Sequence, residues 1–166
     1  MTPEQHQQSD HPSAIDLPSC SNASIGIVVS EQHSEVSLKM LEGAVEVLKS
    51  YGLTEEDIFI SHVPSAAELA FGARQMSIIK EPSAVIVLGC VLKQATPQYE
   101  YLCQSVSMAM TDLNLHSDIP YINGVLMTEN MDQASQYAGG EFGNLGVVSA
   151  ESALKMISMM ALLVNS

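Results

Sequence analysis

One stretch of this chain combines a buried strand, a turn of small residues and the start of a helix, and together these can form a binding site. The apolar run from Ala84 to Leu88 is typical of a strand covered on both faces, and Gly89 opens the turn at its carboxyl end. Open α/β sheets bind ligands at this end. Thr96 followed by Pro97 predicts a helix N-cap with proline in the first helical position, so that unpaired amides face the turn. This arrangement favours anion binding, with phosphate as the natural ligand.

The same residues also have a plainer interpretation. Ala95 and Thr96 could simply lead into and cap a helix, since threonine caps without any ligand are common. Glu68 lies near the start of another predicted helix, where a carboxylate stabilises the helix dipole whether or not it binds anything. Both interpretations stay open on these residues alone.

The elements that would position this turn alternate between strands and helices. Strands are predicted at residues 25–29, 57–62, 84–88 and 120–126, and helices at residues 34–51, 66–79, 98–114, 131–138 and 147–163. This alternation predicts the α/β class, as a three-layer α/β/α sandwich around a mostly parallel four-stranded sheet. Residues 1–22 are polar and aperiodic, so we expect a flexible tail followed by a single domain over residues 23–166.

Composition excludes several partners. The formal net charge is −13 with 6 Lys and Arg residues, which argues against nucleic acid and against an anionic membrane surface. We expect no segment of transmembrane length and no signal peptide, and therefore a cytoplasmic location, or an organelle if a targeting segment has been removed. Cys20, Cys90 and Cys103 are predicted to be reduced thiols because their number and spacing fit neither a disulfide framework nor a zinc site. No pair of histidines has metal-ligand spacing, so we expect no metal site.

Four motifs follow one another along the chain. They are Ser24–Val29 with Leu41–Ala44 (SIGIVV and LEGA), Val63–Leu69 (VPSAAEL), Gly89–Tyr101 (GCVLKQATPQYEY) and Gly124–Gly146 (GVLMTENMDQA continuing to GNLG). In this order, over roughly residues 24–164, they resemble the 6,7-dimethyl-8-ribityllumazine synthase family of riboflavin biosynthesis, and four ordered motifs are far more specific than a lone glycine pattern.

The resemblance implies a flavodoxin-like strand order, an assembly of five subunits or a multiple such as a decamer or 60-mer, and no cofactor. It implies condensation of 5-amino-6-(D-ribitylamino)uracil with 3,4-dihydroxy-2-butanone 4-phosphate at a small-molecule site between subunits. It also implies that the N-terminal tail can add a strand to a neighbour's sheet. The substrate-binding positions would be Gln32, Ala66, Ala67, Glu68, Cys90, Val91, Leu92 and Asn123, and the phosphate-binding positions Lys93, Ala95, Thr96 and Tyr137.

The chain departs from the family at the positions that carry chemistry. The proton-transfer histidine matches Gln98, which cannot titrate, so an acid–base contribution of roughly 10²–10⁴-fold would be missing. The phenylalanine that covers the pyrimidine ring matches Gln32. A second phenylalanine, contributed by a neighbouring subunit, matches Asn123. Ring stacking would therefore be lost together with proton transfer.

Positive charges that the family uses to bind phosphate are also absent. The family's phosphate-binding arginine matches Tyr137, and two further lysines match Glu141 and Leu145. Lys93 remains, but no other Lys or Arg occurs between it and Lys155. These losses favour a catalytically silent paralogue that keeps the assembly or binds a neutral or cationic ligand. The alternative is an active synthase in which Gln98 and water replace the histidine and catalysis depends on orientation.

Overall fold

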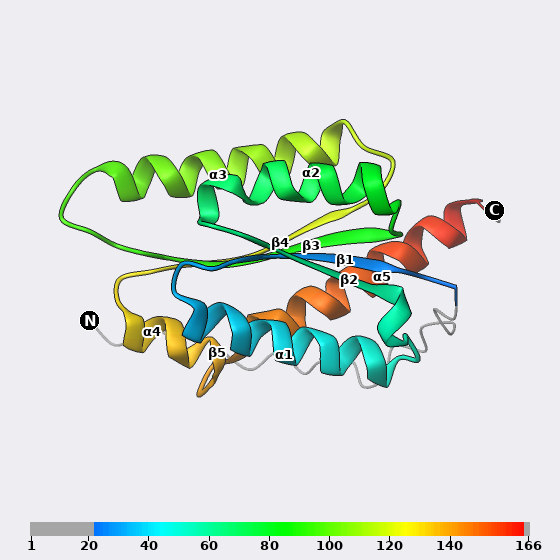
Figure 1. Cartoon of the computed structure of the whole chain (residues 1–166), viewed down its shortest axis with the longest axis horizontal. Helices are drawn as coiled ribbons and strands as arrows, with labels where there is room; N and C mark the ends of the chain where they lie inside the picture. The colour runs from blue at the N-terminus through cyan, green and yellow to red at the C-terminus, as the bar shows by residue number, and fades with distance from the viewer. Residues whose placement is uncertain (1–21, 165–166) are drawn as a thin grey trace.

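The computed structural model describes residues 22–164, and it confirms the predicted α/β sandwich around a parallel sheet (Figure 1). The predicted tail, residues 1–22, lies outside the described residues except for Asn22.

The sheet has four parallel strands in the order β2-β1-β3-β4. They are β1 (Ile25–Ser30), β2 (Ile58–Val63), β3 (Ala84–Leu92) and β4 (Tyr121–Thr128). The two central strands are buried nearly throughout, because both of their faces are covered by helices. β1 and β3 pair in register, with Val29 opposite Leu88, so their carboxyl ends reach the same edge of the sheet.

Two helical layers enclose the sheet (Figure 1). On one side lie α1 (Ser34–Ser50) and α5 (Leu145–Val164), and on the other α2 (Leu69–Lys80) and α3 (Gln98–Leu115). Short helices connect them: η1 (Glu55–Asp57), η2 (Ala66–Glu68) and α4 (Met131–Gln136). Each layer packs against its own apolar cluster, since alternate strand residues point to opposite faces.

The first half of α5 packs closely on α1. A Cβ at Gly146 would overlap the carbonyl of Met40, and one at Gly43 would lie 2.5 Å from the Asn144 side-chain nitrogen. Beyond Leu154 the helix exposes methionine and leucine side chains. By length and composition α5 could cross a membrane, so the expectation that no segment has that length is wrong, although residues of its first half form part of the core.

Two local predictions need correction. Thr96 does not cap α3: the helix begins at Gln98, and its first turn closes on the carbonyl of Pro97, which accepts hydrogen bonds from the amides of Glu100 and Tyr101. Within residues 22–164 the Thr96 side chain makes no hydrogen bond. The second correction concerns the helix predicted over residues 131–138: α4 ends at Gln136, and Ala138 begins an antiparallel hairpin of β5 (Ala138–Gly140) and β6 (Gly143–Asn144), which the sequence pattern did not indicate.

Candidate functional site

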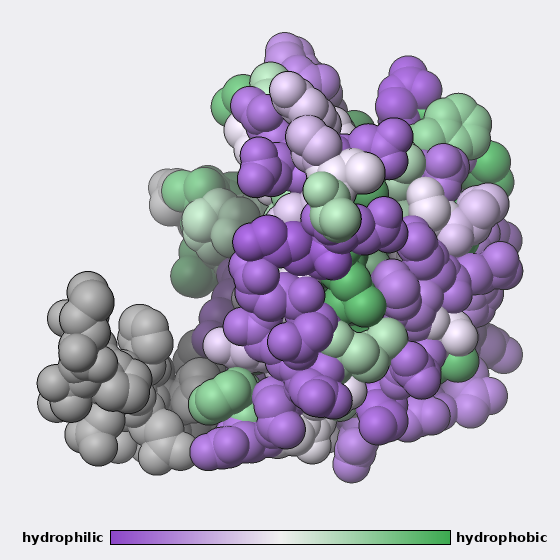
Figure 2. Space-filling model, turned by 90° about the vertical axis from the view of Figure 1, so that its left-hand side faces the viewer, coloured by the Kyte–Doolittle hydropathy of each residue, from purple (hydrophilic) through white to green (hydrophobic). Residues whose placement is uncertain are grey.

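A cavity of about 140 Å³ lies at the carboxyl ends of β1 and β3. It brings together Gln32 after β1, Val91 and Leu92 at the end of β3, and Gln98 at the start of α3, four positions that the family resemblance implied. The remaining lining residues are His33, Gln94, Tyr99 and Leu102. Figure 2 faces this end of the molecule and shows apolar residues within a largely hydrophilic surface.

Among residues 22–164, the side chains that line this cavity are both polar and apolar, and none carries a permanent charge. Three glutamine carboxamides supply hydrogen-bond donors and acceptors, and neither a lysine nor an arginine lines the cavity. Burial raises the pKa of Tyr99, and the adjacent Cys103 thiol raises it further, so the phenol stays protonated. His33 adds an imidazole ring to the lining.

Lys93, the remaining cation of the predicted phosphate set, is already paired. Its ammonium lies 3.0 Å from the carboxylate of Glu129, and its backbone amide donates to the carbonyl of Thr128. Both side chains are about half exposed, at 48% and 62%. Ala95 and Thr96 lie in the exposed loop beside Lys93. An incoming phosphate would therefore compete with Glu129 for this lysine.

Glu68 takes part in a local cap. One of its carboxylate oxygens accepts hydrogen bonds from the Ser65 amide (2.9 Å) and hydroxyl (2.8 Å), while the Ser65 hydroxyl accepts from the amide of Ala67. This reciprocal pattern is a capping box that fixes η2. Ala66 is buried in the core, whereas Ala67 and Glu68 are exposed.

Cys90 lies inside the core on the α1 and α5 side of the sheet and does not line the cavity. Burial raises the pKa of its thiol to about 11, although a hydrogen bond with Thr128 partly opposes this. The thiol therefore stays protonated at neutral pH and is a poor nucleophile.

Asn123 and Tyr137 lie away from this cavity in the same chain. Asn123 is exposed on the edge strand β4, where its side-chain oxygen accepts from the Val125 amide at 3.1 Å. Tyr137 follows α4 and packs on Phe142, with ring centroids 5.0 Å apart. Tyr137, which matches the family's phosphate-binding arginine, is thus part of an exposed aromatic pair.

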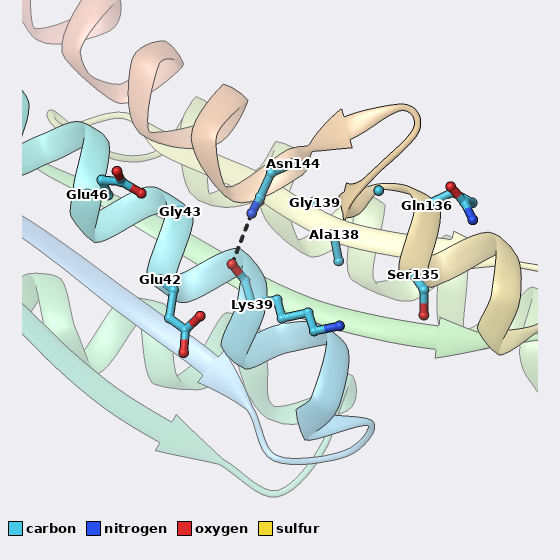
Figure 3. Close-up of a pocket in the computed structure, with 10 residues that line it drawn as sticks. Lys39, Glu42, Gly43, Glu46, Ser135, Gln136, Ala138, Gly139 and Asn144 are labelled. Atoms are coloured by element: carbon cyan, nitrogen blue, oxygen red, sulfur yellow. Dashed lines mark hydrogen bonds between the residues drawn. The ribbon is translucent and has the colours of Figure 1, made fainter.

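Two further hollows flank α1 and were not indicated by the sequence. The first, of about 580 Å³, separates α1 from α4 and the β5–β6 hairpin. In Figure 3 Lys39, Glu42 and Glu46 extend from α1, and Asn144 donates to the Lys39 carbonyl at 3.0 Å. The second, of about 460 Å³, is an apolar groove between α1 and the edge strand β2. Sequence reasoning missed both because charged residues at helical spacing are typical of a solvated face.

The described part of the chain contains no cluster of three His, Cys, Asp or Glu side chains that could hold a metal ion.

Comparison with known proteins places these features in context. The family profile described as 6,7-dimethyl-8-ribityllumazine synthase matches residues 22–161. A Parabacteroides distasonis protein of that name is 43% identical over 87% of this chain and 91% of its own length. A Bacteroides fragilis protein of the same name is 43% identical over 81% of this chain and 94% of its own length. A Limosilactobacillus reuteri protein of that name is 40% identical over 83% of this chain and 90% of its own length. The resemblance inferred from the four motifs is confirmed.

Proposed function

This chain belongs to the 6,7-dimethyl-8-ribityllumazine synthase family of riboflavin biosynthesis, and we propose that it is a catalytically silent member that keeps the family scaffold. The observation that carries the proposal is the lining of the cavity beside Gln98, which holds neither a lysine nor an arginine. With Lys93 paired to Glu129, the phosphate of 3,4-dihydroxy-2-butanone 4-phosphate would find no free cation there. A dianion binds poorly in a partly desolvated site without one.

Stacking and proton transfer are weakened at the same place. Gln32 and Gln98 stand where the family has an aromatic ring and a histidine, and neither carboxamide can stack or titrate in the same way. Three separate physical contributions are then missing at once, so a single compensating change would not restore the reaction.

One observation favours the alternative, an active synthase. His33 lines the same cavity as Gln98, with its backbone in the left-handed region at φ 56° and ψ 45°. An imidazole here could exchange protons through water while Gln98 orients a substrate. Catalysis would then depend mainly on positioning.

An assay of lumazine formation from both natural substrates separates the two functions. We expect the purified chain to show no rate above the uncatalysed reaction, while a family relative such as the Parabacteroides distasonis protein serves as the positive control. A rate comparable to that relative would contradict the proposal, and its loss in His33→Asn would assign the alternative mechanism.

We further propose that the chain assembles as a homopentamer or a multiple of it. The support is exposed apolar surface on the outer helical layer, at Phe71 and Ile78 of α2 and at Tyr101, Met108 and Leu115 of α3. The apolar groove beside β2 also fits the proposed strand from a neighbour's N-terminal tail, because within residues 22–164 β2 pairs only with β1. In such an assembly Asn123 and Tyr137 would reach a neighbour's cavity, and we expect the assembly to be cytoplasmic.

A further inference from the structure

The hollow of about 580 Å³ beside α1 has two walls that come from distant parts of the sequence. One wall is the face of α1 that carries Lys39, Glu42 and Glu46, and the other is formed by α4 and the β5–β6 hairpin. Asn144 joins the two walls, because its side chain donates to the Lys39 carbonyl at 3.0 Å and accepts from the Gly146 amide at 2.8 Å. The hollow is therefore held open by contacts of the folded chain.

The charged side chains of this hollow all come from one face of α1. Lys39, Glu42 and Glu46 are exposed, and within residues 22–164 none of the three forms an ion pair. Lys39 and Glu46 lie about 10 Å apart along the helix axis. In Figure 3 Lys39 extends toward α4, whereas Glu42 and Glu46 lie further along α1 in the other direction. The hollow thus carries positive charge at one end and negative charge at the other.

The opposite wall is polar but uncharged. Gly139 and Gly140 are exposed and have no side chains, so their peptide groups form the surface of the hairpin on this side. Ser135 adds a hydroxyl from α4. This wall can hydrogen-bond a ligand that lies between the charged ends, but it cannot neutralise either end.

We propose that this hollow binds a small zwitterion of the ω-amino acid class, in which several methylene groups separate an ammonium from a carboxylate. The carboxylate would pair with Lys39 and the ammonium with Glu42 and Glu46, so that both ends of the ligand meet opposite charge. Because these side chains are exposed, we expect a dissociation constant of about 1 mM. The hollow shares no lining residue with the cavity beside Gln98, so this site does not depend on the proposed function.

The test is a calorimetric titration of the full-length chain at low ionic strength. The probes are 6-aminohexanoate, which carries both charges, hexylamine, which carries only the ammonium, and hexanoate, which carries only the carboxylate. We expect 6-aminohexanoate to bind about fivefold more tightly than either other probe, because one further exposed ion pair supplies a factor of this order. Added salt should weaken its binding, since exposed charges are screened.

Four variants of α1 locate the binding. Lys39→Met should make 6-aminohexanoate bind no more tightly than hexylamine, and Glu42→Gln combined with Glu46→Gln should make it bind no more tightly than hexanoate. Lys49→Met and Glu35→Gln remove exposed charges of the same helix outside the hollow and should leave binding unchanged. Equal losses in Lys39→Met and Lys49→Met would contradict the assignment to this hollow.

Two other results would overturn the proposal. Equal binding of the three probes would indicate contact with their methylene chains alone. The absence of any heat from 6-aminohexanoate at about 10 mM would exclude the site, because a dissociation constant of about 1 mM predicts near-saturation at that concentration.

Discussion

At the scale of single residues, Lys93 is paired with one neighbouring carboxylate, that of Glu129. Its ion pair with Glu129 is exposed and contributes little to stability, but it occupies the ammonium that a phosphate would need. Glu129→Gln should free Lys93, so that 10 mM phosphate raises the melting temperature by about 1–2 °C more than in the unchanged protein. Asp132→Asn removes a nearby exposed carboxylate that forms no ion pair within residues 22–164, and this variant is the control. An equal gain in both variants would indicate a general charge effect.

The variant Gln98→His introduces the histidine that the family resemblance implies at this position, and it tests the proposed loss of proton transfer. We expect Gln98→His to recover little lumazine formation, because a proton shuttle cannot act on substrates that are not held. Tyr137→Arg with Leu145→Lys should first restore phosphate affinity, and Gln32→Phe should then add a stacking surface. The histidine should supply its factor of roughly 10²–10⁴ only in that background, so the effects are non-additive.

Lumazine absorbance followed over time for each variant measures this order. Most of the recovered rate appearing in Gln98→His alone would mean that the ring and phosphate sites already work. The chain would then be a nearly intact enzyme.

Residue types along the chain predicted which positions meet, but not what each side chain binds. The family resemblance named Gln32, Val91 and Gln98 as site positions, and they meet at one edge of the sheet because its parallel strands end together. The pairing of Lys93 with Glu129 could not be predicted, since it depends on the registered ends of β3 and β4, 36 residues apart. The sequence also did not indicate that His33, the residue before α1, would line the cavity.

At the scale of elements, the contact between α1 and α5 depends on a glycine without room for a side chain. Gly146 lies against the backbone carbonyl of Met40, which cannot rotate away as a side chain could. Gly146→Ala should therefore lower the free energy of unfolding by about 1–3 kcal/mol or more through overpacking. Ser152→Ala, a partly exposed change on the same helix, should stay within about 0.5 kcal/mol.

Urea unfolding followed by circular dichroism measures both variants. A Gly146→Ala protein as stable as Ser152→Ala would show that α5 can shift along α1 to make room.

Periodicity predicted the long elements well because burial imposes it. The continuous apolar run of β3 and the stripe of α1 both follow from packing against the sheet. The β5–β6 hairpin was missed because its few residues, rich in glycine, show no alternation. The predicted Thr96 cap failed because Pro97 itself takes helical angles and supplies the first accepting carbonyl.

At the scale of the whole molecule, a single chain exposes apolar side chains at regular spacing along α2 and α3. Tyr101, Met108 and Leu115 recur every seven residues along α3, with exposed fractions of 71%, 63% and 75%. Phe71 and Ile78 show the same spacing on α2, which packs beside α3 in the same layer (Figure 1). A stripe at this spacing is typical of helices that pack on another copy.

We therefore expect the purified chain to sediment as a pentamer or larger at micromolar concentration, with the stripe buried between copies. Met108→Glu places a charge in that contact and should shift the protein to smaller species, because an unpaired buried charge is strongly unfavourable. Ser107→Glu adds the same charge one residue away, about 100° around the helix, and should leave the assembly intact. Assembly that survives both changes would exclude the α3 stripe as the contact and direct attention to the groove beside β2. A monomer of the unchanged chain would contradict the proposed assembly, and Asn123 and Tyr137 would then have no neighbouring cavity to complete.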